Sequence, residues 1–126
     1  MRNKILVVDD ELSIRMLLDN FLSDDYDVIA KENGYEAMAW LQEGNTAELL
    51  LVDIEMPMVN GYEFTESVRK LKGMSDVPVL MLSAKQKSAD RIRSFAAGAD
   101  DFIQKPFNPE ELMIRIKTAF RRSKAA

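Results

Sequence analysis

Short apolar runs recur along the chain at residues 5–8, 28–30, 49–52, 79–82 and 102–103. Each run is nearly continuous and does not alternate with polar residues, which is typical of strands in a parallel sheet that is covered on both faces. The pattern therefore predicts five buried strands.

Amphipathic segments lie between these runs and predict five helices, each with an apolar face at helical spacing. The last segment opens with Asn108-Pro109-Glu110-Glu111, which predicts an N-cap residue, a proline at the first helical position and a glutamate at the third. The apolar positions are Ile14, Leu17, Leu18, Phe21 and Leu22; Ala37, Met38 and Leu41; Phe64, Val68 and Leu71; Ile92, Phe95 and Ala96; and Leu112, Ile116, Ala119 and Phe120.

Strands that alternate with helices predict an α/β layer fold, and the right-handed rule for crossovers leaves few ways to wind it. The chain has 126 residues, of which 47% are hydrophobic and 30% are charged, and it shows no internal repeat or linker. We therefore expect one globular domain spanning residues 1–126.

Polar residues follow four of the predicted strands. Asp9 and Asp10 come after the first, Asp53 after the third, Ser83 after the fourth and Lys105 after the fifth. In a doubly wound sheet, ligands bind outside the carboxyl ends of the strands. Carboxylates brought within about 5 Å would repel by roughly 3 kcal/mol per pair at an effective dielectric near 20. A raised pKa, a shared lysine or a hard divalent cation would relieve this repulsion.

The composition excludes several classes of function. The net charge is −4 and the only basic cluster lies near residues 117–124, which argues against a nucleic-acid surface on this segment. Cysteine and histidine are absent, so any metal must be held by oxygen ligands. The apolar stretches are too short for a signal peptide or a membrane span. We expect a cytoplasmic protein that contacts neither nucleic acid nor membrane.

Each polar residue also has an ordinary structural interpretation. Asp9 and Asp10 could cap the first helix, Asp53 could begin a turn, Ser83 could cap a helix, and Lys105 could be a solvated charge. The joint pattern favours a shared site, because each residue follows a different strand in the order in which a doubly wound sheet would bring them together.

Six segments resemble the receiver domain of two-component response regulators, over roughly residues 3–122. The resemblance implies a flavodoxin-like, doubly wound parallel sheet of five strands in the order 2-1-3-4-5, with five helices in a three-layer α/β/α arrangement. The segments are Ile5–Glu11, Leu51–Pro57, Gly61, Leu82–Ala84, Gly98–Phe102 and Lys105–Phe107.

The resemblance also implies a phosphorylation chemistry. Asp53 would be the phosphoacceptor, whose carboxylate attacks phosphorus to form an acyl phosphate. Asp10 and Asp53, the backbone carbonyl of Glu55, and Asp9 through water would hold Mg²⁺ or Mn²⁺. The domain would accept a phosphoryl group and slowly hydrolyse its own product, without being an enzyme in the wider sense.

The same resemblance assigns the switch. Lys105 would pair with a phosphoryl oxygen, and a cis bond to Pro106 would aim it inward. Ser83, in place of the commoner threonine, would donate a hydrogen bond to the phosphoryl group. Phe102, in place of the commoner tyrosine, would move into the space that Ser83 leaves; the alternative is that Phe102 is a plain core aromatic.

Three residues are expected to flank the phosphoryl group. Ala84 directly follows Ser83, whereas Glu55 and Lys85 lie two positions after Asp53 and Ser83. As a hypothesis, the opposite charges of Glu55 and Lys85 approach one another over the phosphoryl group and hinder the attacking water, which prolongs the acyl phosphate.

The implied partners are a sensor histidine kinase or a phosphotransfer protein and, after phosphorylation, either a second copy of the chain or another partner that docks on the surface of the fourth helix, fifth strand and fifth helix. In the winged-helix transcription-factor subfamily, surface charges on the fourth helix, fifth strand and fifth helix form such a dimer face. The alternative is a solvated face that contributes little. The corresponding residues are Arg91, Asp100, Asp101, Glu111 and Arg115.

Two other function classes share parts of this pattern. A metal-dependent phosphatase with an aspartate nucleophile would also place Asp53 at a strand end, but it usually has a second aspartate where this chain has Glu55. A flavodoxin-like cofactor carrier would share the sheet, but Asp9-Asp10-Glu11 would repel a phosphate that no metal screens.

Overall fold

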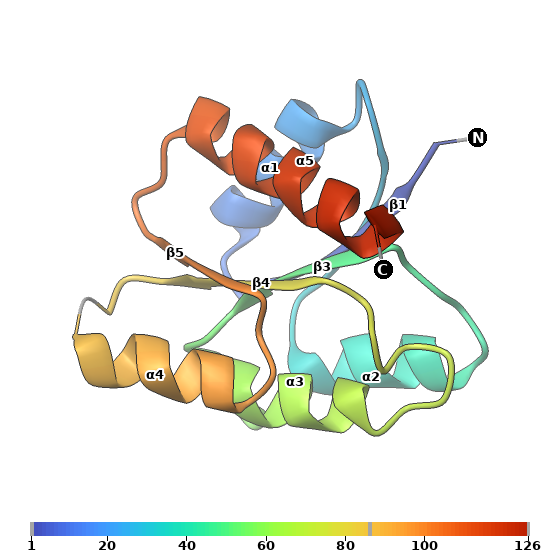
Figure 1. Cartoon of the computed structure of the whole chain (residues 1–126), viewed down its shortest axis with the longest axis vertical. Coiled ribbons are helices and arrows are strands. Elements are labelled where there is room, and N and C mark those ends of the chain that lie inside the picture. Colours follow the sequence, from blue (N-terminus) through green and yellow to red (C-terminus); the bar gives the residue numbers. More distant parts are fainter. Residues whose placement is uncertain (1, 86, 126) are drawn as a thin grey trace.

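The computed structural model describes residues 2–85 and 87–125, and it contains all five predicted strands and all five predicted helices (Figure 1). The strands are β1 (Lys4–Val8), β2 (Asp27–Lys31), β3 (Leu49–Asp53), β4 (Val79–Ser83) and β5 (Asp101–Gln104). The helices are α1 (Leu12–Leu22), α2 (Gly34–Gln42), α3 (Gly61–Arg69), α4 (Ser88–Ala96) and α5 (Pro109–Ala125).

The strands form one parallel sheet in the order β2-β1-β3-β4-β5, which confirms the predicted topology. Helices α1 and α5 cover one face of the sheet, and α2, α3 and α4 cover the other (Figure 1). The winding direction of the crossovers changes between β1 and β3, so the carboxyl ends of these strands are where a ligand site is expected.

Two hydrophobic cores explain why the central strands are continuously apolar. Alternate residues of a strand point to opposite faces, so Leu6, Leu50 and Met81 pack toward α2 and α3. Their neighbours Val7 and Leu51 pack toward α1 and α5. Both faces of the central sheet are therefore buried.

The predicted burial is wrong for β2. Val28 and Ile29 are only partly buried, and Asp27 and Ala30 are exposed. The physical reason is that β2 is an edge strand, paired only with β1. A short apolar run does not reveal whether its strand lies in the middle of a sheet or at its edge.

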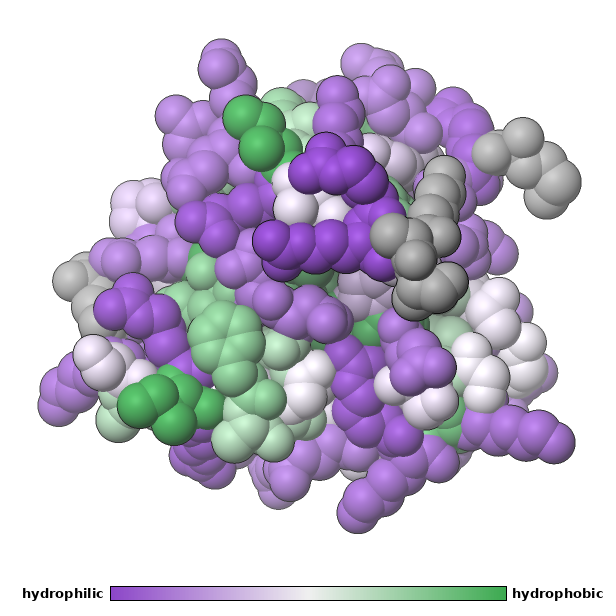
Figure 2. All heavy atoms as spheres, viewed as in Figure 1, coloured by the Kyte–Doolittle hydropathy of each residue, from purple (hydrophilic) through white to green (hydrophobic). Residues whose placement is uncertain are grey.

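Helix α4 also departs from its predicted packing. The helix forms as expected, but Ile92 and Phe95 are 68% and 48% exposed, and Ser94 is the one buried residue within its bounds. Figure 2 shows hydrophobic side chains gathered on the surface over the region where Figure 1 places α4. The apolar face of α4 thus points toward solvent instead of toward the sheet.

The start of α5 matches its prediction. The Asn108 side chain accepts hydrogen bonds from the backbone N–H groups of Glu110 and Glu111, at 2.8 and 3.2 Å, and Pro109 is the first helical residue. Within the described part of the chain, no helix has the length and apolarity that crossing a bilayer requires.

Candidate functional site

The structure brings the predicted polar residues together at the carboxyl ends of the strands. Asp53 ends β3 and Ser83 ends β4, while Asp9 directly follows β1. The Lys105 N–H donates a hydrogen bond to the Ser83 carbonyl at 2.7 Å, which fixes the chain after β5 beside β4. These residues therefore meet because parallel strands end at the same edge of the sheet.

An acidic cluster forms the centre of the site. Asp9, Asp10 and Asp53 each offer one carboxylate oxygen, and these oxygens lie within 4.8 Å of one another. Asp9 and Asp53 are buried, whereas Asp10 is exposed. At this separation each carboxylate pair repels by about 3 kcal/mol at an effective dielectric near 20, so the cluster needs a positive charge.

Lys105 supplies part of that charge. Its Nζ lies 2.8 Å from Asp9 Oδ2 and 3.3 Å from Asp53 Oδ1, with Glu11 at 4.0 Å. Burial opposes a charged lysine, but the hydrogen bond to Asp9 and the negative charges of Asp53 and Asp9 outweigh it and raise the pKa of Lys105. The peptide bond from Lys105 to Pro106 is cis, as predicted.

Asp53 remains under-compensated despite this lysine. Its Oδ1 is a buried side-chain atom with no hydrogen-bond partner among the described residues, although Lys105 is at ion-pair distance. Burial, followed by the charge of Asp9, raises the pKa of Asp53 to about 7 against the opposing effect of Lys105. A buried carboxylate oxygen without a donor is rare in proteins and is suited to a cation or to a new covalent bond.

Asp9 does not cap α1, so that alternative interpretation is wrong. Glu11 occupies the N-cap position without a side-chain capping bond. Asp9 Oδ1 instead accepts a hydrogen bond from the Glu11 N–H at 2.9 Å, and its Oδ2 binds Lys105. Arg15, which sequence reasoning missed, donates to the Asp9 carbonyl at 2.8 Å. Asp9 is therefore held rigidly within the site.

The loop after β3 passes very close to the end of that strand. The Gly61 N–H donates to the Ile54 carbonyl at 2.9 Å, and a Cβ on Gly61 would lie 2.6 Å from the Asp53 carbonyl oxygen. Only glycine fits there, which explains in physical terms the glycine among the segments that carry the resemblance. In the same loop, Met58 has a φ of +68° and is 75% exposed.

Ser83 is buried and fully hydrogen-bonded, but not to Asp53. Its Oγ donates to Glu55 Oε1 at 2.8 Å and accepts from the Lys85 N–H at 2.9 Å. Glu55, Lys85 and Ala84 are exposed around it. Among the described residues Glu55 and Lys85 form no ion pair; the Glu55 carboxylate is bonded to the Ser83 hydroxyl.

Phe102 lies in the hydrophobic core next to the site. It is 7% exposed, pairs in register with Met81 and belongs to the core on the α2–α4 side of the sheet. Its ring is thus buried while the Ser83 hydroxyl is bonded to Glu55. The movement of Phe102 on phosphorylation stays a prediction.

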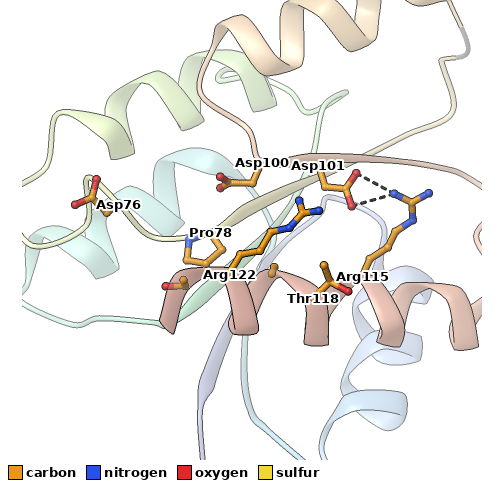
Figure 3. Close-up of a pocket in the computed structure, with 9 residues that line it drawn as sticks. Asp76, Pro78, Asp100, Asp101, Arg115, Thr118 and Arg122 are labelled. Atoms are coloured by element: carbon orange, nitrogen blue, oxygen red, sulfur yellow. Dashed lines mark hydrogen bonds and ion pairs between the residues drawn. The ribbon is translucent and has the colours of Figure 1, made fainter. Parts of the chain in front are cut away.

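The charges expected to form a dimer face are mostly paired within the chain. Arg115 contacts both oxygens of Asp101 at 2.9 Å and Glu111 at 3.0 Å. Figure 3 shows the Arg115–Asp101 pair beside a pocket of about 190 Å³ between α5 and the starts of β4 and β5. Arg91 is exposed and has no side-chain partner within the described ranges.

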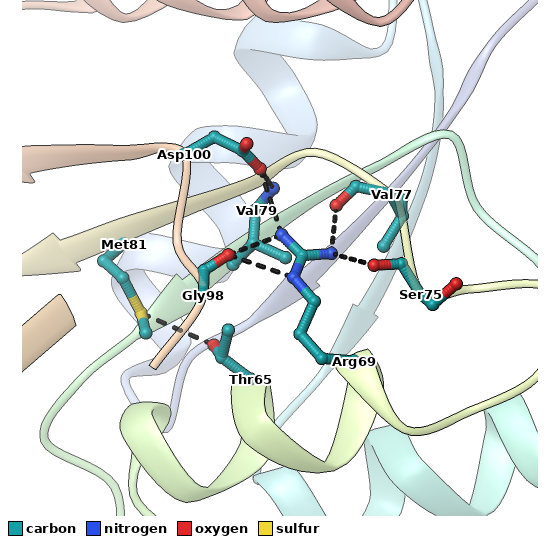
Figure 4. Close-up of polar contacts among 8 residues, drawn as sticks. All are labelled: Thr65, Arg69, Ser75, Val77, Val79, Met81, Gly98 and Asp100. Atoms are coloured by element: carbon teal, nitrogen blue, oxygen red, sulfur yellow. Dashed lines mark hydrogen bonds and ion pairs between the residues drawn. The ribbon is translucent and has the colours of Figure 1, made fainter. Parts of the chain in front are cut away.

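Asp100 is held by Arg69, a residue that sequence reasoning missed. The Arg69 guanidinium donates to the Gly98 carbonyl at 2.6 and 3.0 Å, to the Val77 carbonyl at 2.6 Å and to Asp100 at 3.1 Å (Figure 4). Asp100 also accepts from the Val79 N–H at 2.8 Å. We call these residues the Arg69 clamp; it ties the end of α3 to the turn after α4 and the start of β4.

The donor set at the strand ends fits a hard divalent cation. It consists of carboxylate oxygens and includes the unpartnered Asp53 Oδ1, and oxygen ligands are those that Mg²⁺ and Mn²⁺ prefer. A cation there would cancel the repulsion among Asp9, Asp10 and Asp53.

Comparison with known families gives a match over most of the chain. The model described as "Response regulator receiver domain" matches residues 5–117. The chain is 44% identical over 121 residues to the transcriptional regulatory protein ResD of Bacillus subtilis, covering 95% of this chain and 49% of that protein. It is 42% identical over 122 residues to a CpxR homolog of Haemophilus influenzae, covering 96% and 52%. The chain thus spans about half the length of these relatives.

Solved structures agree with this match. The chemotaxis protein CheY4 of Vibrio cholerae superposes with a TM-score of 0.89 at 32% identity, covering 94% of this chain and 99% of that one. A CheY-like receiver domain protein of Methanospirillum hungatei superposes with a TM-score of 0.91 at 28% identity, covering 99% and 98%.

Proposed function

The chain belongs to the family of response regulator receiver domains, and on this premise we propose that it is a phosphoacceptor switch in which Asp53 takes a phosphoryl group from a phosphohistidine. The observation that supports Asp53 best is its buried Oδ1, which has no hydrogen-bond partner among the described residues and lies beside Lys105. That oxygen is free to form a bond to phosphorus.

The transfer is a nucleophilic displacement. An Asp53 carboxylate oxygen attacks phosphorus, and the bond between phosphorus and the donor imidazole nitrogen breaks. The electron pair stays on that nitrogen, which takes up a proton from solvent, and the product is an aspartyl phosphate. Water then slowly attacks the same phosphorus, the bond between phosphorus and the Asp53 oxygen breaks, and inorganic phosphate leaves with the Asp53 carboxylate restored.

The surrounding residues lower the barrier through charge and position. Lys105, already directed at Asp53 Oδ1 at 3.3 Å, pairs with a phosphoryl oxygen, and Ser83 donates a hydrogen bond to another. Asp10, Asp53 and the Glu55 carbonyl, with Asp9 through water, would hold Mg²⁺ or Mn²⁺, which supplies charge neutralisation for the transferred oxygens when it is bound.

The output is a change at the surface formed by α4, β5 and α5. Phosphorylation adds about −1.5 to −2 charges, and the phosphoryl oxygens attract the Ser83 hydroxyl. Movement of Ser83 then increases the population of chains in which the Phe102 ring is turned inward. The exposed apolar face of α4, with Ile92 and Phe95, and the exposed Arg91 support this surface as the place where a partner binds.

The partners follow from the chemistry and from the relatives. The donor is a sensor histidine kinase or a phosphotransfer protein in the cytoplasm. The phosphorylated chain binds a second copy of itself or another partner through the surface of α4, β5 and α5, and this segment contacts no nucleic acid. The similar proteins are named as transcriptional regulators, and the chain spans about half their length.

The proposal is tested by incubating the chain with Mg²⁺ and acetyl phosphate, then measuring intact mass. We expect one alkali-labile phosphoryl adduct, lost in Asp53→Asn and with EDTA, but kept in the matched control Asp19→Asn on the exposed face of α1. An adduct that persists in Asp53→Asn would contradict the assignment. Steady turnover of phosphomonoesters would support a phosphatase instead, for which no comparison gives support.

A further inference from the structure

The hydrogen bond between Ser83 and Glu55 has a consequence for the switch. A serine hydroxyl has one proton to donate, and here that proton is directed to Glu55 Oε1 at 2.8 Å. The Lys85 N–H occupies the oxygen of the same hydroxyl at 2.9 Å. Ser83 therefore has no proton left for a phosphoryl oxygen on Asp53.

We propose that Glu55 is a latch: its carboxylate holds the Ser83 hydroxyl in the unphosphorylated chain and competes for it with the phosphoryl group on Asp53. The proposal rests on the proposed function of Asp53. Glu55 is then a positioning residue that acts through Ser83. It determines how much free energy is needed to move the Ser83 hydroxyl to the phosphoryl group.

The surroundings of Ser83 support competition instead of sharing. Asp53 pairs in register with Leu82, the residue before Ser83, and the Ile54 N–H donates to the Leu82 carbonyl at 3.0 Å. The ends of β3 and β4 are thus fixed side by side, and Glu55 and Asp53 lie on the same short segment. Of the two carboxylates on this segment, the Ser83 hydroxyl donates to Glu55. Asp53 Oδ1 receives no hydrogen bond among the described residues.

The exposure of Glu55 determines the strength of the latch. Ser83 is buried, so its hydroxyl needs an acceptor at all times, whereas Glu55 is exposed. When the hydroxyl leaves, the Glu55 carboxylate recovers hydrogen bonds from water and is not left as a buried unpaired charge. The latch therefore opposes switching only by the net contribution of one hydrogen bond, which a phosphoryl oxygen can replace.

The test separates the hydrogen bond from the charge of Glu55. Glu55→Gln removes the charge but keeps a carbonyl oxygen that can accept the Ser83 proton, whereas Glu55→Ala removes both. Beryllofluoride with Mg²⁺ serves as a non-covalent mimic of the phosphoryl group on Asp53, and calorimetry measures its Kd. We expect Glu55→Ala to bind the mimic about 2- to 12-fold more tightly than Glu55→Gln, the ratio that corresponds to one net hydrogen bond.

A double-mutant cycle and a spectrum of the free chain complete the test. In a Ser83→Ala background, Glu55→Ala and Glu55→Gln should bind the mimic equally. In the free chain, Glu55→Ala should shift the NMR signals of Ser83 and of the Lys85 amide, and Glu55→Gln should leave them near their wild-type positions.

Each result decides a different claim. If Glu55→Ala and Glu55→Gln bind the mimic equally when Ser83 itself is unchanged, the latch is overturned. The same follows if the NMR signals of Ser83 and Lys85 do not distinguish the two variants. Failure of every variant, wild type included, to bind the mimic would instead overturn the proposed function of Asp53. In that case the spectra of the free chain still decide whether Glu55 holds Ser83.

Discussion

Removing the Asp53 carboxylate should stabilise the metal-free chain at neutral and alkaline pH. Burial and the neighbouring charge of Asp9 raise the pKa of Asp53 from 3.8 to about 7. A raised carboxyl pKa means that the folded state binds the proton more tightly than the unfolded state does. The protonated Asp53 carboxyl therefore favours the folded state, and this contribution is complete below pH 3.8 and is lost as pH rises through about 7. Above that pH the buried carboxylate is charged, and its removal should stabilise the chain.

The magnitude follows from the size of the shift. At 1.36 kcal/mol per unit, a shift from 3.8 to about 7 corresponds to at most about 4 kcal/mol of destabilisation when Asp53 is ionised. Asparagine has nearly the same shape and no charge, but it weakens the contact with Lys105 at 3.3 Å. We therefore expect Asp53→Asn to raise the free energy of unfolding by about 1–4 kcal/mol at pH 8.

Urea unfolding at 25 °C in EDTA, at pH 5 and pH 8, measures this effect. The gain from Asp53→Asn should be larger at pH 8 than at pH 5 and should shrink in saturating Mg²⁺. Asp19→Asn, the matched exposed control, should change stability by less than about 0.5 kcal/mol. A variant no more stable than wild type at pH 8 in EDTA would refute the account of Asp53 as an under-compensated buried charge.

The other predictions concern the same site and its supports. The affinity for Mg²⁺, measured by calorimetry, should increase by up to about tenfold for each pH unit as pH rises toward 7, because Mg²⁺ competes with the proton on Asp53. An affinity that does not change between pH 5.5 and 7 would argue against this competition. Gly61→Ala should lower the free energy of unfolding by more than about 2 kcal/mol, since its Cβ would lie 2.6 Å from the Asp53 carbonyl oxygen. The control Gly44→Ala, which has open space around its Cβ at a φ of +96°, should lower it by only about 1–2 kcal/mol. Equal losses in urea unfolding would show that the steric clash at Gly61 is not the cause. Arg69→Ala should destabilise by about 2–4 kcal/mol because it breaks the Arg69 clamp, and Arg69→Lys should recover little since lysine lacks the planar fork; full recovery in the lysine variant would show that charge alone matters. Met58→Gly should raise the free energy of unfolding by about 0.5–1 kcal/mol, and with it the melting temperature, because Met58 has a φ of +68° and an exposed side chain. A lower melting temperature would contradict the inference that the backbone at Met58 is strained.

The fold was predictable because its signals are local. Continuous apolar runs mark β1, β3 and β4, which are buried on both faces, and helical spacing marks the covering layers. Burial was less predictable: β2 lies at an edge and α4 turns Ile92 and Phe95 to solvent. The exposure of β2 and of the α4 side chains depends on which other elements pack beside them. The residues of one strand or helix do not contain that information.

The site was predictable where chemistry follows a strand end. Asp9, Asp53 and Lys105 meet as expected because parallel strands end at one edge. Arg69 was missed because most of its partners are backbone carbonyls, which carry no sequence signal. The hydrogen bond from the Ser83 hydroxyl to Glu55 was also missed, because a serine at the end of a strand gives no sign in the sequence of which acceptor it will meet; the approach of Glu55 and Lys85 over a phosphoryl group stays a prediction.

The central claim is that Asp53 is the carboxylate that becomes covalently modified. The most direct measurement is peptide mass spectrometry after reaction with acetyl phosphate and Mg²⁺, followed by borohydride reduction, which converts an aspartyl phosphate to homoserine. We predict homoserine at position 53 and unmodified residues at positions 9, 10 and 55. Homoserine at position 9 or 10, or 2-amino-5-hydroxypentanoic acid (the reduction product of a glutamyl phosphate) at position 55, with aspartate intact at 53, would contradict it.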